Sequence, residues 1–179
     1  MNPSPPSQRS LADYTSLSLI IPQLHGRMTT AVMQELSEVL HHEEVTVSDH
    51  LFRNLAALNR ELLTGKSSDF GAAFPQVIVP TLKRPRFALG RSPESLPWRV
   101  KWLPAIQLVF LIAGPSKNDL EYQQLVAALR RLGKDRLRLD DLLNAYNGEQ
   151  MLGLLAQYPM EAENQFSKVS GALPILLTT

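Results

Sequence analysis

The feature that most constrains the fold is the run from Ile106 to Ala113, which reads IQLVFLIA. Its side chains are almost all aliphatic or aromatic, and Gly114 and Pro115 close it. A strand that is apolar on both faces is typical of a sheet covered on both sides. The run therefore predicts the central strand of a sheet. The full apolar stretch, which begins at Leu103, falls well short of the roughly 20 residues that span a bilayer.

Amphipathic helices are predicted on both sides of this strand. Apolar residues recur at helical spacing from Met28 to Leu40, and a second such pattern begins at the potential N-cap Ser48 and ends near Gly65. A third, Leu120 to Leu132, has Asn118 or Asp119 as its cap and Gly133 at its end. Two shorter patterns follow, at Leu139–Tyr146 and Glu149–Gln157.

Short strands are predicted between the two groups of helices. Val77 to Val79 is a β-branched run that stops at Pro80. Further along, the large apolar residues Phe87 and Leu89 alternate with Arg86, Ala88 and Gly90. Helices, then strands, then helices predict an α/β domain in which helices pack against a sheet. A chain of 179 residues is long enough for one such core. We expect a flexible Pro/Ser-rich tail at 1–12, one domain at 13–162 and a C-terminal extension at 163–179.

Composition excludes several classes of function. The sequence has no cysteine, so disulfides and thiolate metal sites are excluded, and a cytoplasmic protein is the simplest expectation. The formal net charge of +1 gives no overall attraction to nucleic acid or anionic lipid. Basic residues gather in two places that we interpret as solvated surface: Lys83, Arg84, Arg86 and Arg91, and then Arg130, Arg131, Lys134, Arg136 and Arg138.

The histidines suggest neither a metal site nor a catalytic site. His41 and His42 are adjacent on a predicted helix and so point in different directions, and His25 and His50 stand alone. No phosphate-binding or nucleophile motif is present, and no cofactor is expected. The loop 64–71 (TGKSSDFG) has glycines and hydroxyls whose backbone could hold an anion, although such a loop is more often a plain connection.

Taken in order, four segments resemble enzyme IIA of the bacterial phosphotransferase system, of the fructose, mannitol and nitrogen-regulatory type. They are Arg60–Glu61 with the stretch to Gln76, Leu82–Pro85, Ile106–Pro115 and Leu125–Leu132. The similarity extends from about Tyr14 to Glu161. It implies a single α/β domain with a mixed central sheet flanked by helices.

The resemblance also implies a phosphoacceptor histidine after Ala-x-Pro, where this chain has Gln76. A glutamine amide lacks the basic nitrogen that a phosphoacceptor needs. A second family histidine aligns with Glu121, whose carboxylate would repel a phosphoryl group, and a family arginine aligns with Ile78. The loop keeps Gly71 but has larger or charged residues where the family has small ones, namely Lys66, Ser68 and Asp69.

Four differences in one expected pocket indicate a protein that has lost histidine phosphotransfer. We expect a regulatory module that binds a transporter, a regulator or the histidine phosphocarrier protein. The expected surface surrounds Gln76 and includes Lys66, Ser67, Ser68, Asp69, Gly71 and Glu121. One alternative is a working phosphotransferase whose acceptor is Asp69, His25, His41, His42 or His50, and another is a sensor that holds a small anion at Lys66 and Ser67.

Overall fold

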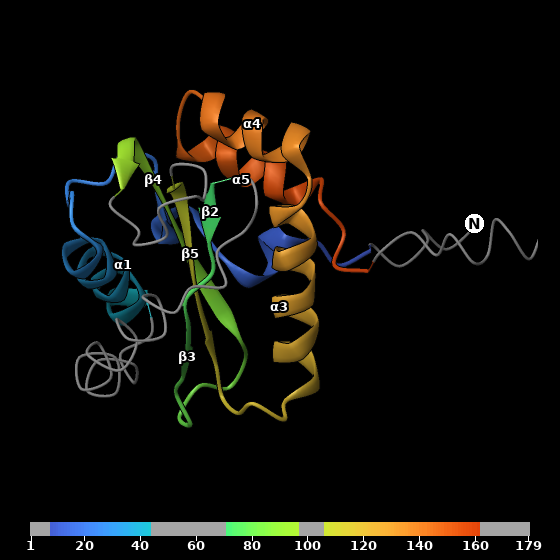
Figure 1. Cartoon of the computed structure of the whole chain (residues 1–179). Coiled ribbons are helices and arrows are strands. Elements are labelled where there is room, and N and C mark those ends of the chain that lie inside the picture. Colours follow the sequence, from blue (N-terminus) through green and yellow to red (C-terminus); the bar gives the residue numbers. More distant parts are fainter. Residues whose placement is uncertain (1–7, 44–70, 97–105, 162–179) are drawn as a thin grey trace, which may run out of the picture.

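The computed structural model describes residues 8–43, 71–96 and 106–161. Helices lie on both sides of a twisted sheet (Figure 1). The helical elements are η1 (Leu11–Tyr14), η2 (Leu17–Leu19), α1 (Thr29–Glu43), α3 (Leu120–Gly133), α4 (Arg136–Asn144) and α5 (Gly148–Ala156). The strands are β1 (Ile20–Ile21), β2 (Ala72–Ala73), β3 (Gln76–Ile78), β4 (Arg86–Leu96) and β5 (Ile106–Gly114).

Strand β5 is the centre of the sheet, as its apolar sequence predicts. The strands run in the order β1-β4-β5-β2, and β3 also pairs with β5. β4 and β5 are antiparallel, whereas β2 and β3 are parallel to β5 and β1 is parallel to β4. This arrangement confirms the prediction of an α/β domain with a mixed sheet.

The two faces of β5 belong to two different hydrophobic cores. Leu108 and Phe110 pack into a core shared with η1, α3, α4 and α5. Val109 and Leu111 point to the opposite side, into a core shared with α1. Figure 1 shows α1 and α3 on opposite sides of the sheet. Alternation along a strand sends successive side chains to opposite faces, so a run that is apolar at every position supplies both cores.

The predicted helices that fall within the described ranges are present, but α4 begins three residues before the predicted Leu139 and ends two before Tyr146, and the strands differ in length from expectation. Helix α3 begins and ends where the sequence predicts, with Asp119 as its N-cap. β4 extends through Leu96, past an irregularity in its pairing after Arg91, and is longer than the alternation around Phe87 indicated. The helix expected to begin at Ser48 lies outside the described residues.

The packed part of the chain begins earlier than the predicted boundary at residue 13. Leu11 has no exposed surface, and its N–H donates to the carbonyl of Tyr158 at 3.0 Å. The N–H of Met160 donates in turn to the carbonyl of Arg9 at 2.9 Å. The tail prediction is therefore wrong for residues 9–12. The Pro/Ser-rich composition of the preceding segment gave no indication that Leu11 would be buried. No helix in the described ranges is long and apolar enough to cross a membrane.

Candidate functional site

The candidate site is centred on Gln76, the first residue of β3. Gln76 pairs in register with Ile112 of β5, and its half-buried side chain lies on the α3 side of the sheet. The hydroxyl of Tyr122, on the first turn of α3, donates to Gln76 Oε1 at 2.8 Å. The side-chain oxygen at the expected phosphoacceptor position therefore already has a partner inside the protein.

Two neighbours fix Tyr122 in this place. Asp119 caps α3, and its Oδ2 accepts from the backbone N–H of Tyr122 at 2.9 Å. Gly114 ends β5 beneath the phenol ring, and a Cβ there would lie 2.8 Å from Tyr122 Cε2 and closer still to Cγ and Cδ2. Because Gly114 has no side chain, the ring can lie against the strand and reach Gln76.

Glu121, the position aligned with the second family histidine, lies in a network of its own. Its Oε2 accepts from the hydroxyl of Tyr14 at 3.1 Å. Arg9 Nη1 lies 3.6 Å from Oε2, and Arg84 Nε lies 3.5 Å from Oε1. Two guanidinium groups thus offset the carboxylate, and the repulsion of phosphate expected from the sequence is correspondingly weakened.

The same network changes the acidity of its members. Burial raises the pKa of Tyr14, and the adjacent carboxylate of Glu121 raises it further, because both disfavour a phenolate. Glu121 also raises the pKa of Arg84, whose guanidinium lies 5.4 Å from the centre of the Tyr14 ring. Tyr14 therefore remains a neutral hydroxyl donor at physiological pH.

The remaining expected site residues are only partly brought together. Ile78 lies two residues beyond Gln76 on the same strand and packs against the α3 core, so it supplies no charge. Gly71 is buried, adopts a positive φ of 90° that favours glycine, and accepts from the N–H of Gln107 at 3.0 Å. Lys66, Ser67, Ser68 and Asp69 lie outside the described residues, as do two of the alternative acceptors, Asp69 and His50.

The other alternative acceptors lie away from Gln76. His41 and His42 end α1, which covers the opposite face of the sheet from α3. His25 precedes α1; its side chain is 92% exposed, and its Nδ1 lies 3.4 Å from Glu35 Oε2. Within the described ranges no three His, Asp or Glu side chains gather as a metal site.

Sequence reasoning missed most of the polar partners at this site. The sequence indicates Arg84 only as part of a basic surface, and it gives no reason to assign Arg9 or Tyr14 to the site. The sequence places Tyr122 on the first turn of a predicted helix, three residues after the capping Asp119, but it does not indicate that the hydroxyl reaches Gln76. No sequence signal indicated that Tyr14 would reach Glu121, since the two residues are 107 positions apart.

Comparison with known proteins supports the fold. No family model and no curated protein matches the sequence. Among solved structures, IIA-Ntr from Neisseria meningitidis is similar with a TM-score of 0.62 and 17% identity, covering 81% of this chain and 98% of that one. IIA mannitol from Escherichia coli gives 0.63 and 15%, covering 78% and 97%.

A third similar structure is a complex of enzyme IIA mannitol with phosphorylated enzyme IIB mannitol from Escherichia coli. Its TM-score is 0.62 at 14% identity, with 79% of this chain and 96% of that one covered. At such low identity the likeness concerns backbone architecture. The chain has the fold of phosphotransferase-system enzyme IIA.

Proposed function

We propose that this protein is a degenerate member of the enzyme IIA family that no longer transfers phosphate through the β3 position and acts as a regulatory, partner-binding module. The observation that carries this proposal is the hydrogen bond from the Tyr122 hydroxyl to Gln76 Oε1. It supports the proposal because Gln76, which the family resemblance aligns with the phosphorylated histidine, is a neutral side chain that already has a hydrogen-bond partner.

The chemistry of this pair argues against phosphotransfer. A phosphoacceptor needs a lone pair that can attack phosphorus, and the amide nitrogen of glutamine has delocalised its lone pair into the carbonyl. Tyr122, whose hydroxyl contacts Gln76, is also only 4% exposed as a residue. An incoming phosphoryl group would have to displace this ring as well as find a nucleophile.

Binding of a protein partner is the function proposed for this surface. The similar mannitol enzyme IIA was solved in complex with a phosphorylated enzyme IIB. For this chain we propose docking of a transporter, a regulator or the histidine phosphocarrier protein around Gln76 and Glu121. Gly71 and the residues Lys66, Ser67, Ser68 and Asp69 are further candidates for partner contacts. A cytoplasmic location belongs to the same proposal.

The test is a phosphoryl-transfer assay read by intact mass. The protein is incubated with phosphoenolpyruvate, enzyme I and the histidine phosphocarrier protein, beside the variants Gln76→His and Gln76→Leu. We expect no added phosphoryl group on the natural protein or on Gln76→Leu, which controls for the loss of the Tyr122 hydrogen bond. A gain on Gln76→His alone would show that the rest of the pocket remains competent.

Phosphate on the natural protein would contradict the proposal. Mapping the modified residue would then identify a relocated acceptor, for which Asp69 and the histidines are the candidates. The partner surface is tested separately, by mapping where a bound partner protects backbone amides from hydrogen exchange. Protection that avoids both Gln76 and Glu121 would remove the docking part of the proposal.

A further inference from the structure

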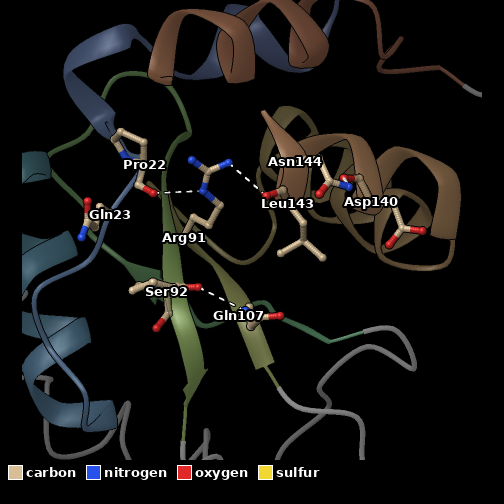
Figure 2. A pocket seen from close by; sticks show the side chains of 9 residues that line it. Pro22, Gln23, Arg91, Ser92, Gln107, Asp140, Leu143 and Asn144 are labelled. Carbon is tan, nitrogen blue, oxygen red and sulfur yellow. Dashed lines mark hydrogen bonds between the residues drawn. The ribbon is translucent and has the colours of Figure 1, made fainter. Parts of the chain in front are cut away.

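A polar cavity lies at the other end of the sheet from the Gln76 site. Its volume is about 560 Å³, within the usual range for small-molecule sites. β4 and β5, the residues after β1 and the C-terminal half of α4 line it, and Figure 2 shows the side chains that do so. Gln107 of β5 lines the cavity, five residues before Ile112, the register partner of Gln76. At about 3.3 Å per residue, roughly 17 Å of strand separates the two sites.

Arg91 gives the cavity a positive charge that no described carboxylate neutralises. Its Nε donates to the carbonyl of Pro22 at 3.0 Å. Its Nη1 donates to the last carbonyls of α4 and its C-cap, at 2.9 Å to Leu142 and 2.7 Å to Ala145 (Figure 2 shows the Pro22 bond and a further one to Leu143). All these acceptors are uncharged, and within the described ranges no Asp or Glu forms an ion pair with Arg91. Nη2 is left without a described acceptor, so one edge of the guanidinium remains available to a ligand.

Asp140 gives the same cavity a negative charge that is also unpaired. Its backbone carbonyl accepts from Asn144 Nδ2 at 2.8 Å, whereas its carboxylate has neither a hydrogen bond nor an ion pair with any described residue. Arg91 and Asp140 therefore line one cavity with opposite charges and do not pair with each other.

The amides in the wall add further hydrogen-bonding groups. Gln107 Nε2 makes a weak bond of 3.4 Å to the carbonyl of Ser92, and Asn144 uses its Nδ2 on Asp140. Neither amide oxygen has a hydrogen-bond donor among the described residues. Together with the Asp140 carboxylate, these oxygens are acceptors for a ligand that brings N–H donors as well as an acidic group.

We propose that this cavity binds a small zwitterion of the amino acid type, with its carboxylate on Arg91 and its ammonium on Asp140. A simple anion would be attracted by Arg91 but repelled by Asp140. A simple cation would be attracted by Asp140 but repelled by Arg91. A zwitterion satisfies both charges at once, and complementary charge is what gives such a site its specificity. Arg91 also bridges β4, the residue after β1 and the end of α4, so the ligand would bind where three elements meet.

The test compares four-carbon probes that differ only in charge: butyrate, butylamine, α-aminobutyrate and γ-aminobutyrate, the last two holding their charges at different separations. Binding to the full-length protein is measured by thermal shift and calorimetry, since a ligand of the folded state raises the unfolding temperature. We expect at least one zwitterion to bind at millimolar concentration or below, and to shift the amide signals of Ser92, Gln107 and Asn144. An equal response to all four probes, or none to either zwitterion, would overturn the proposal.

Matched variants locate the charge recognition. Asp140→Asn should weaken zwitterion binding about tenfold or more, the usual size of a lost charged hydrogen bond. Asp141→Asn removes the neighbouring exposed carboxylate, which does not line the cavity, and should leave binding unchanged. Equal effects of the two variants would refute the role of Asp140. Arg91 is not substituted because its removal would also free the end of α4, and Gln107→Glu serves instead, as its new charge should repel the carboxylate of the ligand.

Discussion

At the scale of single residues, the site depends on contacts in which one residue makes room for another. The absent side chain of Gly114 lets the Tyr122 ring lie on the end of β5, and the ring then brings a hydroxyl to Gln76. Neither the glycine nor the tyrosine has a role that its own neighbours in sequence reveal. Gln76, in contrast, could be proposed as a replaced phosphoacceptor from the sequence, because the order of motifs aligns it with the histidine of the family that it resembles.

Gly114→Ala should therefore displace Tyr122 and destabilise the protein by about 1–3 kcal/mol, the usual cost of overpacking a core position. Urea denaturation measures the loss in the free energy of unfolding, and the hydroxyl-to-Gln76 contact can be followed by NMR. The control is Gly153→Ala: Gly153 lies on an exposed part of α5, with open space around a Cβ. It should stabilise the protein by about 0.5–1 kcal/mol, since alanine is the better helix former. Destabilisation by both variants would contradict the packing argument.

Tyr122→Phe tests the hydrogen bond without moving the ring. Removing the hydroxyl leaves Gln76 Oε1 without its partner, and we expect a loss of about 0.5–1 kcal/mol, toward the low end for hydrogen bonds because Gln76 is partly exposed and water can replace the phenol. A double-mutant cycle with Gln76→Leu measures the coupling. If the two losses simply add, the bond contributes nothing to stability.

At the scale of elements, helix α3 orients the site through its first turn. Asp119 caps the helix and holds the N–H of Tyr122, while Glu121 faces Tyr14 and the two arginines. The position and cap of α3 were predictable, because capping residues and helical spacing act locally. The pairing of β3 with β5 was not readable from β3 itself, since three residues carry too little pattern to choose a neighbour.

Asp119→Ala should cost about 1 kcal/mol of stability, since it removes the N-cap, and should loosen Tyr122 along with it. Asp119→Ser keeps an oxygen acceptor and should restore most of the loss. Urea denaturation of the three proteins checks the ranking, and hydrogen exchange at the Tyr122 amide reports the local effect. Equal stability of the alanine and serine variants would show that capping does not matter here.

Helix α1 is fastened at its C-terminal end by Glu43. Hydroxyls of Ser18 and Ser16 lower the pKa of Glu43, and Arg86, 3.8 Å away, adds to this. A folded-state pKa below the unfolded value means that this contribution is present at neutral pH and is lost as the pH falls below about 4.5. The natural protein should thus lose stability more steeply with acid than Glu43→Gln, by a small amount because the carboxylate is a third exposed. Glu38→Gln, an exposed carboxylate on the same helix, is the control, and urea unfolding across the acid range is the measurement.

At the scale of the whole molecule, one central strand joins two cores that draw on different parts of the sequence. The central strand was predictable, because a near-continuous apolar run of this length is typical of a strand buried on both faces. Long-range polar contacts were not, since the Arg9 and Tyr14 links to Glu121 connect segments whose separation no local pattern records. The Arg91 cavity was missed for the same reason: the sequence presents Arg91 only as part of a basic cluster.

The hydrogen bonds between residues 9–11 and 158–160 have a consequence for engineering. They bring the first and last segments of the described part of the chain side by side. Domains with adjacent ends tolerate circular permutation and insertion into a host loop. A permutant that joins these two segments by a short linker and opens the chain in the exposed turn at Tyr146 should keep the sheet, both cores and the Gln76 site. The segment 9–160 should likewise tolerate insertion into a loop of another protein.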